Sequence, residues 1–345
     1  MINIFIITFV SIYFLIHYSE KLGLVDIPNE RSMHKKVTPR GAGIAFVLSV
    51  FLVVLLFGFE QFKTYYYIYL AIAMVFIAGA WDDLKNISPK IKFLFIFLSS
   101  LLLYINDFAI YSLGTYFGYE ILLPSWLVFP FTFFAIAGYT NALNLMDGLD
   151  GLAASISIVI FVTFLSIGIE NQDKLLISLS SFFTIALVAF LLFNWHPAKV
   201  FMGDSGSLAL GMVISILAIK ALHYITPVSV LFIVAIPVLD TFIVITRRIQ
   251  RHGSPFKADK NHMHHFLYNV KGDVRYTVII LVLMQIVFSI IGYQLNPSNE
   301  FLSLILFMIF FYLYLNLFDQ RLKRRKHQEE KKEEIQKNSL TIHKR

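Results

Sequence analysis

The sequence predicts an all-α, polytopic membrane protein. Of its 345 residues, 57% are hydrophobic and 16% aromatic, whereas soluble domains are about 45–50% apolar. Leu, Ile, Phe and Val recur as far as Phe318 in stretches long enough to cross about 30 Å of hydrocarbon. We therefore expect one membrane domain over residues 1–320, whose loops form the active site, and a charged tail over residues 321–345.

The apolar stretches divide into about eleven spans of helical length. The first stretch, from Ile2 to Ile16, has neither a preceding basic segment nor a small-residue cleavage site. We therefore expect a retained helix rather than a cleaved signal peptide. The predicted spans are 1–19, 41–59, 64–80, 91–106, 125–142, 152–169, 173–193, 204–223, 227–246, 276–294 and 300–318.

The basic residues predict the orientation of these spans, because cytoplasmic loops retain Lys and Arg. They concentrate in loops 20–40 and 247–275 and in the tail, whereas the alternate loops hold only Lys63 and Lys174. This pattern predicts an external N-terminus and a cytoplasmic C-terminus. It also assigns the net charge of +7 to topology rather than to nucleic-acid binding, and the tail is expected to contact anionic lipid headgroups. The absence of cysteine excludes thiol chemistry.

Acidic residues gather at the predicted cytoplasmic boundary. Asp82 and Asp83 follow the third span, Asp147 and Asp150 follow the fifth, and Asp204 opens the eighth. Carboxylates beside hydrocarbon are costly unless they pair, bind a cation or line a wet cavity, so this grouping indicates a shared site. Helix capping is the alternative for each Asp alone. It is weaker for Asp82 and Asp83, whose adjacent charges repel each other.

The segment around Asn144 adds further oxygen ligands. Asn144, Asp147 and Asp150 are spaced by three, and Gly148 and Gly151 interrupt the helix there. Glycines allow backbone amides to approach a phosphate or a nucleobase, although a simple helix break between two spans is the alternative. Hard oxygen ligands without thiols favour Mg²⁺, with Mn²⁺ also suitable.

The long loop 247–275 supplies basic partners that would attract an anionic substrate. The residues expected to contact phosphate are Arg247, Lys257, His262, His264 and His265. Three histidines so close in sequence do not readily complete a tetrahedral zinc site, so zinc is disfavoured. Positive charge that serves topology alone is the other interpretation, and it applies equally to Lys90 and Lys92 beside the aspartate pair.

Taken together, these motifs resemble the polyprenyl-phosphate N-acetylhexosamine-1-phosphate transferases, which begin O-antigen, teichoic acid and related glycan assembly. The resemblance extends from Leu24 to Leu267. Its motifs are Asp26-Ile27-Pro28-Asn29-Glu30-Arg31 with His34, Pro39-Arg40-Gly41, Asp82-Asp83, Asn141 to Leu152, Asn194 to Gly206, Pro237 to Asp240, Ser254-Pro255-Phe256, and His262-Met263-His264-His265.

The resemblance implies an enzyme of the bacterial inner membrane, with its active site on the cytoplasmic face. It would transfer a sugar 1-phosphate, most commonly GlcNAc 1-phosphate, from a UDP-sugar to undecaprenyl phosphate and release UMP. Asp204 matches the magnesium ligand, and Asp82 and Asp83 match the acidic pair near the metal and the lipid phosphate. The other implied roles are a nucleotide site for Asp147 and Asp150, a uracil-stacking ring for Phe201, phosphate contacts for His262, His264 and His265, and a basic residue after the aspartate pair for Lys90.

Several alternatives stay open at this point. Direct attack by the lipid phosphate, with Asp82 or Asp83 accepting or ordering its proton, competes with a covalent aspartyl-phosphate intermediate. The sugar could instead be FucNAc or QuiNAc, or the chain could be a phospho-MurNAc-pentapeptide transferase, although Met263 interrupts the run of three histidines typical of that branch. An ion-coupled transporter would hold its acids near the bilayer midplane, where only Asp240 is expected. The resemblance also makes a homodimer an expectation.

Overall fold

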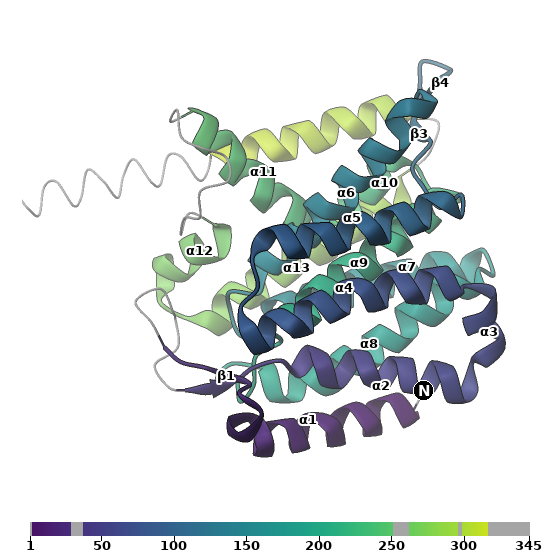
Figure 1. Cartoon of the computed structure of the whole chain (residues 1–345). Helices are drawn as coiled ribbons and strands as arrows, with labels where there is room; N and C mark the ends of the chain where they lie inside the picture. Colours follow the sequence, from purple (N-terminus) through teal and green to yellow (C-terminus); the bar gives the residue numbers. More distant parts are fainter. Residues whose placement is uncertain (1, 29–36, 251–261, 296–298, 317–345) are drawn as a thin grey trace, which may run out of the picture.

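Apolar helices form most of the chain, and Figure 1 shows them packed side by side in one bundle. The computed structural model describes residues 2–28, 37–250, 262–295 and 299–316. Its longer helices are α1 (Ile2–Leu22), α2 (Ala42–Phe57), α4 (Tyr66–Lys85), α5 (Pro89–Ile105), α6 (Ser125–Met146), α7 (Leu152–Glu170), α8 (Lys174–Asn194), α9 (Asp204–Ala221), α11 (Ala235–Gln250), α13 (Val274–Gln294) and a last helix, Glu300–Asn316. The short helices are α3 (Phe59–Thr64), α10 (Pro227–Ile233) and α12 (Met263–Lys271).

The helical, polytopic architecture predicted from the sequence is confirmed. In the described part of the chain, seven helices are long and apolar enough to cross a membrane, or up to eight if the bent pair α10 and α11 is one span. The helices Ala42–Phe57 and Glu300–Asn316 are also apolar but shorter. Each predicted span contains a helix, whereas the count of about eleven crossings and the orientation stay predictions. The tail over residues 321–345 lies outside the described residues.

Helix α9 forms the centre of the bundle, with 83% of its apolar window buried inside the molecule. Small residues allow its neighbours to approach closely, as is common for helices packed within a membrane. A Cβ added to Gly43 in α2 would overlap the backbone of Gly206, and one added to Gly211 would lie 2.6 Å from Thr140 Cα in α6. The ends of α2, α6 and α9 are therefore held together tightly enough to build a site.

Two small antiparallel sheets depart from the all-α prediction. Strands β1 (Val25–Asp26) and β2 (Thr38–Pro39) pair beside the end of α1, and β3 (Ser112–Tyr116) and β4 (Tyr119–Leu122) form a hairpin. At the hairpin turn, Phe117 and Gly118 have φ angles of 54° and 82°, the positive values that tight hairpin turns require. The hairpin and α3 lie at one end of the bundle, and β1 and α12 lie at the other (Figure 1).

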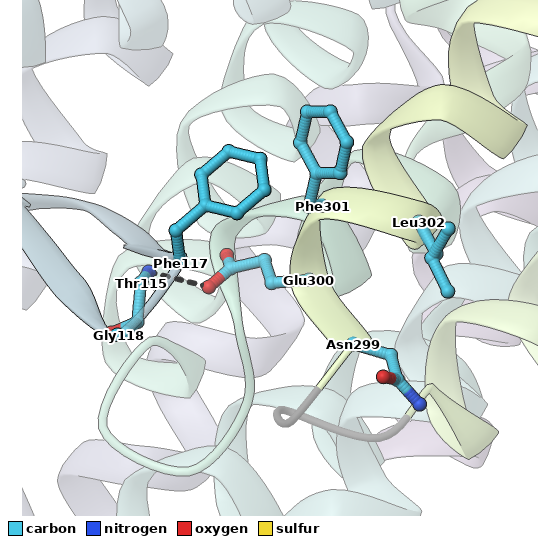
Figure 2. A pocket seen from close by; sticks show the side chains of 7 residues that line it. All are labelled: Thr115, Phe117, Gly118, Asn299, Glu300, Phe301 and Leu302. Atoms are coloured by element: carbon cyan, nitrogen blue, oxygen red, sulfur yellow. Dashed lines mark hydrogen bonds between the residues drawn. The ribbon is translucent and has the colours of Figure 1, made fainter.

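The last helix is fastened to this hairpin by Glu300. The Glu300 side chain is buried, and its Oε2 accepts a hydrogen bond of 2.6 Å from the Thr115 amide. The ring centroids of Phe117 and Phe301 are 4.6 Å apart beside it. Figure 2 shows these side chains around a pocket of about 320 Å³. The helix Glu300–Asn316 is thus held against a hairpin that lies far earlier in the sequence.

The predicted span 227–246 is not one straight helix, because α10 and α11 meet at an angle of 89°. Pro237, in the first turn of α11, has no amide hydrogen and cannot continue the hydrogen bonding of α10. Gln285 of α13 satisfies the backbone groups that the bend frees: its Nε2 donates to the Ile233 carbonyl (2.7 Å), and its Oε1 accepts from the Ile236 amide (3.1 Å). An irregular backbone within a membrane domain needs such partners.

Replacing Gln285 by Leu tests this explanation of the bend. The variant leaves one carbonyl and one amide unpaired in an apolar surrounding, so we expect the free energy of unfolding to fall by about 1–3 kcal/mol for each. Thermal unfolding of the detergent-solubilised protein measures the change. Gln294→Leu is the matched control, because Gln294 ends the same helix and is exposed. Equal losses in the two variants would contradict the role of Gln285.

Candidate active site

Asp82, Asp83, Asp147 and Asp204 lie where α4 and α6 end and α9 begins. The predicted positions of Asp82 and Asp83 after the third span are wrong, because α4 continues to Lys85 and carries both in its last turn. The structure agrees with the other two expectations: Asp147 follows directly after α6, and Asp204 is the first residue of α9. We call Asp82, Asp83 and Asp204, with Lys92 and Asn144, the acidic cluster.

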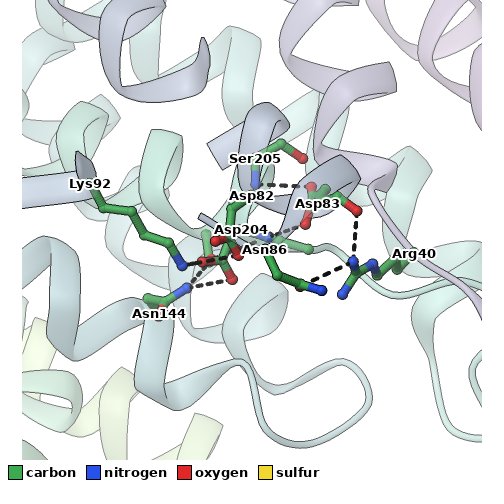
Figure 3. A network of polar contacts seen from close by, with 10 residues as sticks. Arg40, Asp82, Asp83, Asn86, Lys92, Asn144, Asp204 and Ser205 are labelled. Atoms are coloured by element: carbon green, nitrogen blue, oxygen red, sulfur yellow. Dashed lines mark hydrogen bonds and ion pairs between the residues drawn. The ribbon is translucent and has the colours of Figure 1, made fainter. Parts of the chain in front are cut away.

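Asp83 caps the start of α9 from a different helix (Figure 3). The residue is 2% exposed. Its Oδ1 accepts from the Asp204 amide at 2.8 Å, and its Oδ2 accepts from the Ser205 amide at 3.1 Å. These amides have no partner inside their own helix, and the helix dipole favours a negative charge beside them. Asp83 therefore fixes the position of its neighbour Asp204.

Gly203 makes this close approach possible. Its φ of 76° lies in the left-handed region, and a Cβ added there would lie 2.6 Å from both carboxylate oxygens of Asp83. Any other residue would be strained and would displace the carboxylate. The glycine before Asp204 is therefore required by the cap that Asp83 forms.

Lys92 of α5 lies between two carboxylates. Its Nζ is 3.0 Å from Asp82 Oδ2, and it forms a direct ion pair with Asp204 Oδ2 (Figure 3). Lys90, which the resemblance favoured, is exposed, and its substrate-binding role stays a prediction. The lysine that the structure brings to the acidic cluster is Lys92. It partly balances the charge that two converging carboxylates would otherwise concentrate there.

Asn144 orients the other oxygen of Asp204. Its Nδ2 donates to Asp204 Oδ1 at 3.1 Å and to Ser207 Oγ at 2.8 Å. Lys92 and Asn144 thus engage one oxygen of Asp204 each, so this carboxylate is held from two sides. Arg40, which sequence reasoning did not single out as a site residue, approaches from the opposite side and donates to the Asp83 carbonyl at 2.7 Å.

Asp150 belongs to a second group, formed with the loop between α8 and α9. Its Oδ2 accepts from the Ala198 amide at 3.1 Å and lies 2.6 Å from His196 Nδ1. Sequence reasoning missed His196, because a single histidine before a proline gives no signal of its own. Near Asp150, burial raises the pKa of Asp147 well above its usual range, and the neighbouring charges of Asp204, Asp83 and Asp150 raise it further.

The histidine cluster, which comprises His262, His264 and His265, lies against the segment between α6 and α7. The ring centroids of His262 and His264 are 5.6 Å apart, and those of His264 and His265 are 4.3 Å apart. A Cβ added to Gly148 would lie 2.9 Å from His264 Nε2, so this ring packs on the segment that carries Asp147 and Asp150. Burial lowers the pKa of His264 to about 3, which keeps its imidazole neutral at pH 7.

The remaining predicted residues have different environments. Arg247 is buried in α11. Phe201 is half-buried, and its backbone joins two segments: its amide donates to the Pro39 carbonyl at 2.8 Å, and its own carbonyl accepts from the Ala42 amide at 3.1 Å. Lys257 lies outside the described residues. The predicted roles of all three stay predictions.

The acidic cluster offers oxygen ligands but not a complete metal cage. Among the residues that the structure describes, no three His, Cys, Asp or Glu side chains converge as a metal site. Asp82 and Asp204 nevertheless converge on one cation, the Lys92 ammonium. Two carboxylates of this kind fit Mg²⁺, which proteins commonly bind through one or two carboxylates together with substrate phosphates and water.

A polytopic helix bundle with a polar, charged site at one end defines a membrane-embedded enzyme rather than a scaffold. The model of glycosyl transferase family 4 matches residues 65–222. The probable undecaprenyl-phosphate N-acetylglucosaminyl 1-phosphate transferase of Bacillus subtilis (strain 168) is 34% identical over 293 residues, which are 84% of this chain and 82% of that protein. The undecaprenyl-phosphate alpha-N-acetylglucosaminyl 1-phosphate transferase of Escherichia coli (strain K12) is 30% identical over 331 residues, 91% of this chain and 89% of that one.

The undecaprenyl-phosphate alpha-N-acetylglucosaminyl 1-phosphate transferase of Yersinia pestis is 31% identical over 330 residues, which are 91% of this chain and 89% of that protein. Similarity of this extent shows that the chain belongs to glycosyl transferase family 4. The family resemblance read from the motifs is therefore confirmed.

Gly203→Ala tests the contact between Gly203 and Asp83. The positive φ alone costs about 1–2 kcal/mol for a residue with a Cβ, and the added methyl group must also push Asp83 away from the amides of α9. Gly118→Ala is the matched control, since Gly118 has a φ of 82° and an added Cβ there would meet no atom within 4 Å. Thermal unfolding should show a larger loss for Gly203→Ala, and equal losses would contradict the proposed contact.

Proposed function

We propose that the protein transfers GlcNAc 1-phosphate from UDP-GlcNAc to undecaprenyl phosphate, with release of UMP, and so starts the assembly of a lipid-linked cell-envelope glycan. The observation that carries the proposal is the similarity along 84% of the chain to a relative whose name states this activity. The charged site supports it, because both substrates are anionic phosphates. No relative reported above has a name that favours the phospho-MurNAc-pentapeptide branch.

Charge neutralisation is the main requirement of this reaction, since two phosphorylated substrates repel each other. Asp82 and Asp204 are the residues proposed to hold Mg²⁺, for which Mn²⁺ could substitute. When bound, the ion would neutralise phosphate charge and polarise the attacked phosphorus. Lys92 supplies a positive charge beside the same carboxylates, and the histidine cluster is proposed to contact the phosphates from the side of the Asp147–Asp150 segment.

The two adjacent aspartates have different roles in this proposal. Both oxygens of Asp83 are used by the amides of α9, which makes Asp83 a residue that positions Asp204. Asp82 has a more exposed side chain than Asp83 and contacts Lys92 through one oxygen. Asp82 is therefore the better choice for ordering the proton of the lipid phosphate.

The apolar cavity suits the polyprenyl chain of the acceptor. It has a volume of about 660 Å³ and lies between the β3–β4 hairpin, α6, α9, α10 and α11. Its lining is almost wholly apolar and includes Leu113, Phe134, Ile214, Val238 and Phe242. An isoprenoid chain would gain about 25 cal/mol for each Å² of apolar surface that it removes from water.

We further propose that the acidic cluster faces the cytoplasm in a bacterial inner membrane, with the N-terminus outside. The distribution of Lys and Arg supports this orientation, and UDP-sugars are cytoplasmic donors. A homodimer remains a prediction from the family resemblance. A transporter is a weaker alternative, since Asp82, Asp83, Asp147 and Asp204 lie at helix ends rather than mid-span.

Asp204→Asn tests the reaction and the metal proposal together. With purified protein, undecaprenyl phosphate and UDP-GlcNAc, the unchanged protein should release UMP only when lipid and Mg²⁺ are both present. The variant should lose about 100-fold or more in kcat, because the neutral amide binds a divalent cation poorly. Asp173→Asn is the matched control, since Asp173 caps α8 and contacts Lys220 near the opposite end of the bundle. Full Mg²⁺-dependent turnover in Asp204→Asn would contradict the metal assignment.

Gly138→Leu tests the apolar cavity as the lipid site. Gly138 lines the cavity, and an added Cβ would meet no atom within 4 Å, so a Leu side chain should enter the cavity without disturbing the helix. We expect KM for undecaprenyl phosphate to rise about 10-fold while KM for UDP-GlcNAc changes less than about 2-fold. Gly138→Ala, which leaves most of the volume open, should behave like the unchanged protein. An unchanged KM for the lipid in Gly138→Leu would exclude this cavity.

A further inference from the structure

Asp240 is a buried carboxylate that the proposed reaction does not use directly. It lies within α11 and is 4% exposed. An isolated charge in such a place is costly unless hydrogen bonds compensate for the lost water. Both of its oxygens have partners: Oδ1 accepts from the Met263 amide at 2.7 Å, and Oδ2 lies 2.9 Å from His262 Nδ1.

The first of these contacts caps α12. The residue before this helix, His262, does not cap it with its own side chain, so the Asp240 carboxylate provides the acceptor for the first helical amide. A carboxylate at a helix start is also favoured by the helix dipole. Asp240 therefore anchors the helix that begins within the histidine cluster.

The second contact defines the protonation of His262. An ionised carboxylate only accepts hydrogen bonds, so His262 Nδ1 must carry the proton that it shares with Asp240. When the ring is neutral, its Nε2 is then the unprotonated nitrogen; once this nitrogen takes up a proton, it can donate a hydrogen bond to a phosphate oxygen. His262 is 5% exposed, and its ring stacks on His264 with an interplanar angle of 14°. One carboxylate thus sets both the tautomer and the orientation of this ring.

We propose that Asp240 is a positioning residue of the active site, which acts by holding His262 in the Nδ1–H tautomer and fixing the histidine cluster against the Asp147–Asp150 segment. His264 carries this placement onward, because its Nε2 lies next to Gly148. The role rests on the proposed function, in which the cluster contacts the phosphates, and it adds to that function a residue that never touches substrate. A His held by a carboxylate in this way loses much of its effect when the carboxylate becomes an amide, because the amide favours the other tautomer.

Asp240→Asn is the main test, because it keeps the shape of the side chain but removes its negative charge and changes which tautomer of His262 it favours. We expect kcat for UMP release to fall about 10-fold or more, as is typical when a residue that orients another is replaced, while KM for UDP-GlcNAc changes less than about 3-fold. Asp273→Asn is the matched control. Asp273 caps the next helix, α13, by accepting from the Tyr276 amide; this variant also exchanges a capping carboxylate for an amide that can still accept, and it should keep its kcat.

A double-mutant cycle with His262→Asn separates positioning from a merely structural role. The Asn amide can still donate to Asp240 in place of Nδ1, but it has no counterpart of Nε2. We expect His262→Asn to unfold at nearly the same temperature as the unchanged protein and to lose kcat as Asp240→Asn does. Adding Asp240→Asn to it should then cost less than about 2-fold further, since the two changes remove one function.

Two results would overturn the proposal: an unchanged kcat in Asp240→Asn, or multiplicative losses in the double variant. If Asp240→Asn does not fold, His262→Asn alone decides, because an unchanged kcat in that variant rules out any action through this ring. Failure of the proposed function is a separate outcome. It would appear as a lack of UMP release by the unchanged protein with undecaprenyl phosphate, UDP-GlcNAc and Mg²⁺.

Discussion

The contact between the Asp83 carboxylate and the start of α9 holds the site together. The amides of Asp204 and Ser205 need acceptors at the end of a buried helix, and Gly203 has no side chain to provide one. Asp83 provides both acceptors from α4, so the end of one helix is fixed against the end of another. Asp204 then points toward Asp82 and Lys92 without freedom to turn away. Burial of a charge, which would destabilise most membrane helices, here stabilises a defined geometry.

The sequence predicted the helical class and the helix positions well, because apolar length directly reports the thickness of hydrocarbon. Its errors share one physical cause, which is that the deciding partner lies far away in the chain. The bend between α10 and α11 depends on Gln285, about fifty residues later, and Pro237 within the segment is compatible with a kinked span as well as with a sharp bend. The Phe117-Gly118 turn is local, but its hairpin is short and irregular and is closed by Glu300.

The same limit, a deciding partner that lies far away in the chain, applies to the residues of the site. The cost of carboxylates beside hydrocarbon was enough to single out the aspartates, whereas the choice between Lys90 and Lys92 was not open to sequence reasoning. Residues two apart on a helix face different sides, so the choice depends on which side of α5 meets α4. In the structure, Lys92 lies on the side of α5 that faces Asp82 of α4. His196 was missed because its partner, Asp150, belongs to another loop.

Helix α11 shows why the position of the bend matters to both halves of the site. At about 100° per residue, Val238, Phe242 and Ile245 lie roughly opposite Asp240 around the helix. The three apolar side chains line the apolar cavity. On the other side of the helix, Asp240 holds His262 and the start of α12. Because a helix is stiff, a rotation that widened the cavity would also pull on the histidine cluster. Gln285 fixes the direction of α11 at the bend. It therefore also fixes the position of the histidine cluster relative to the apolar cavity.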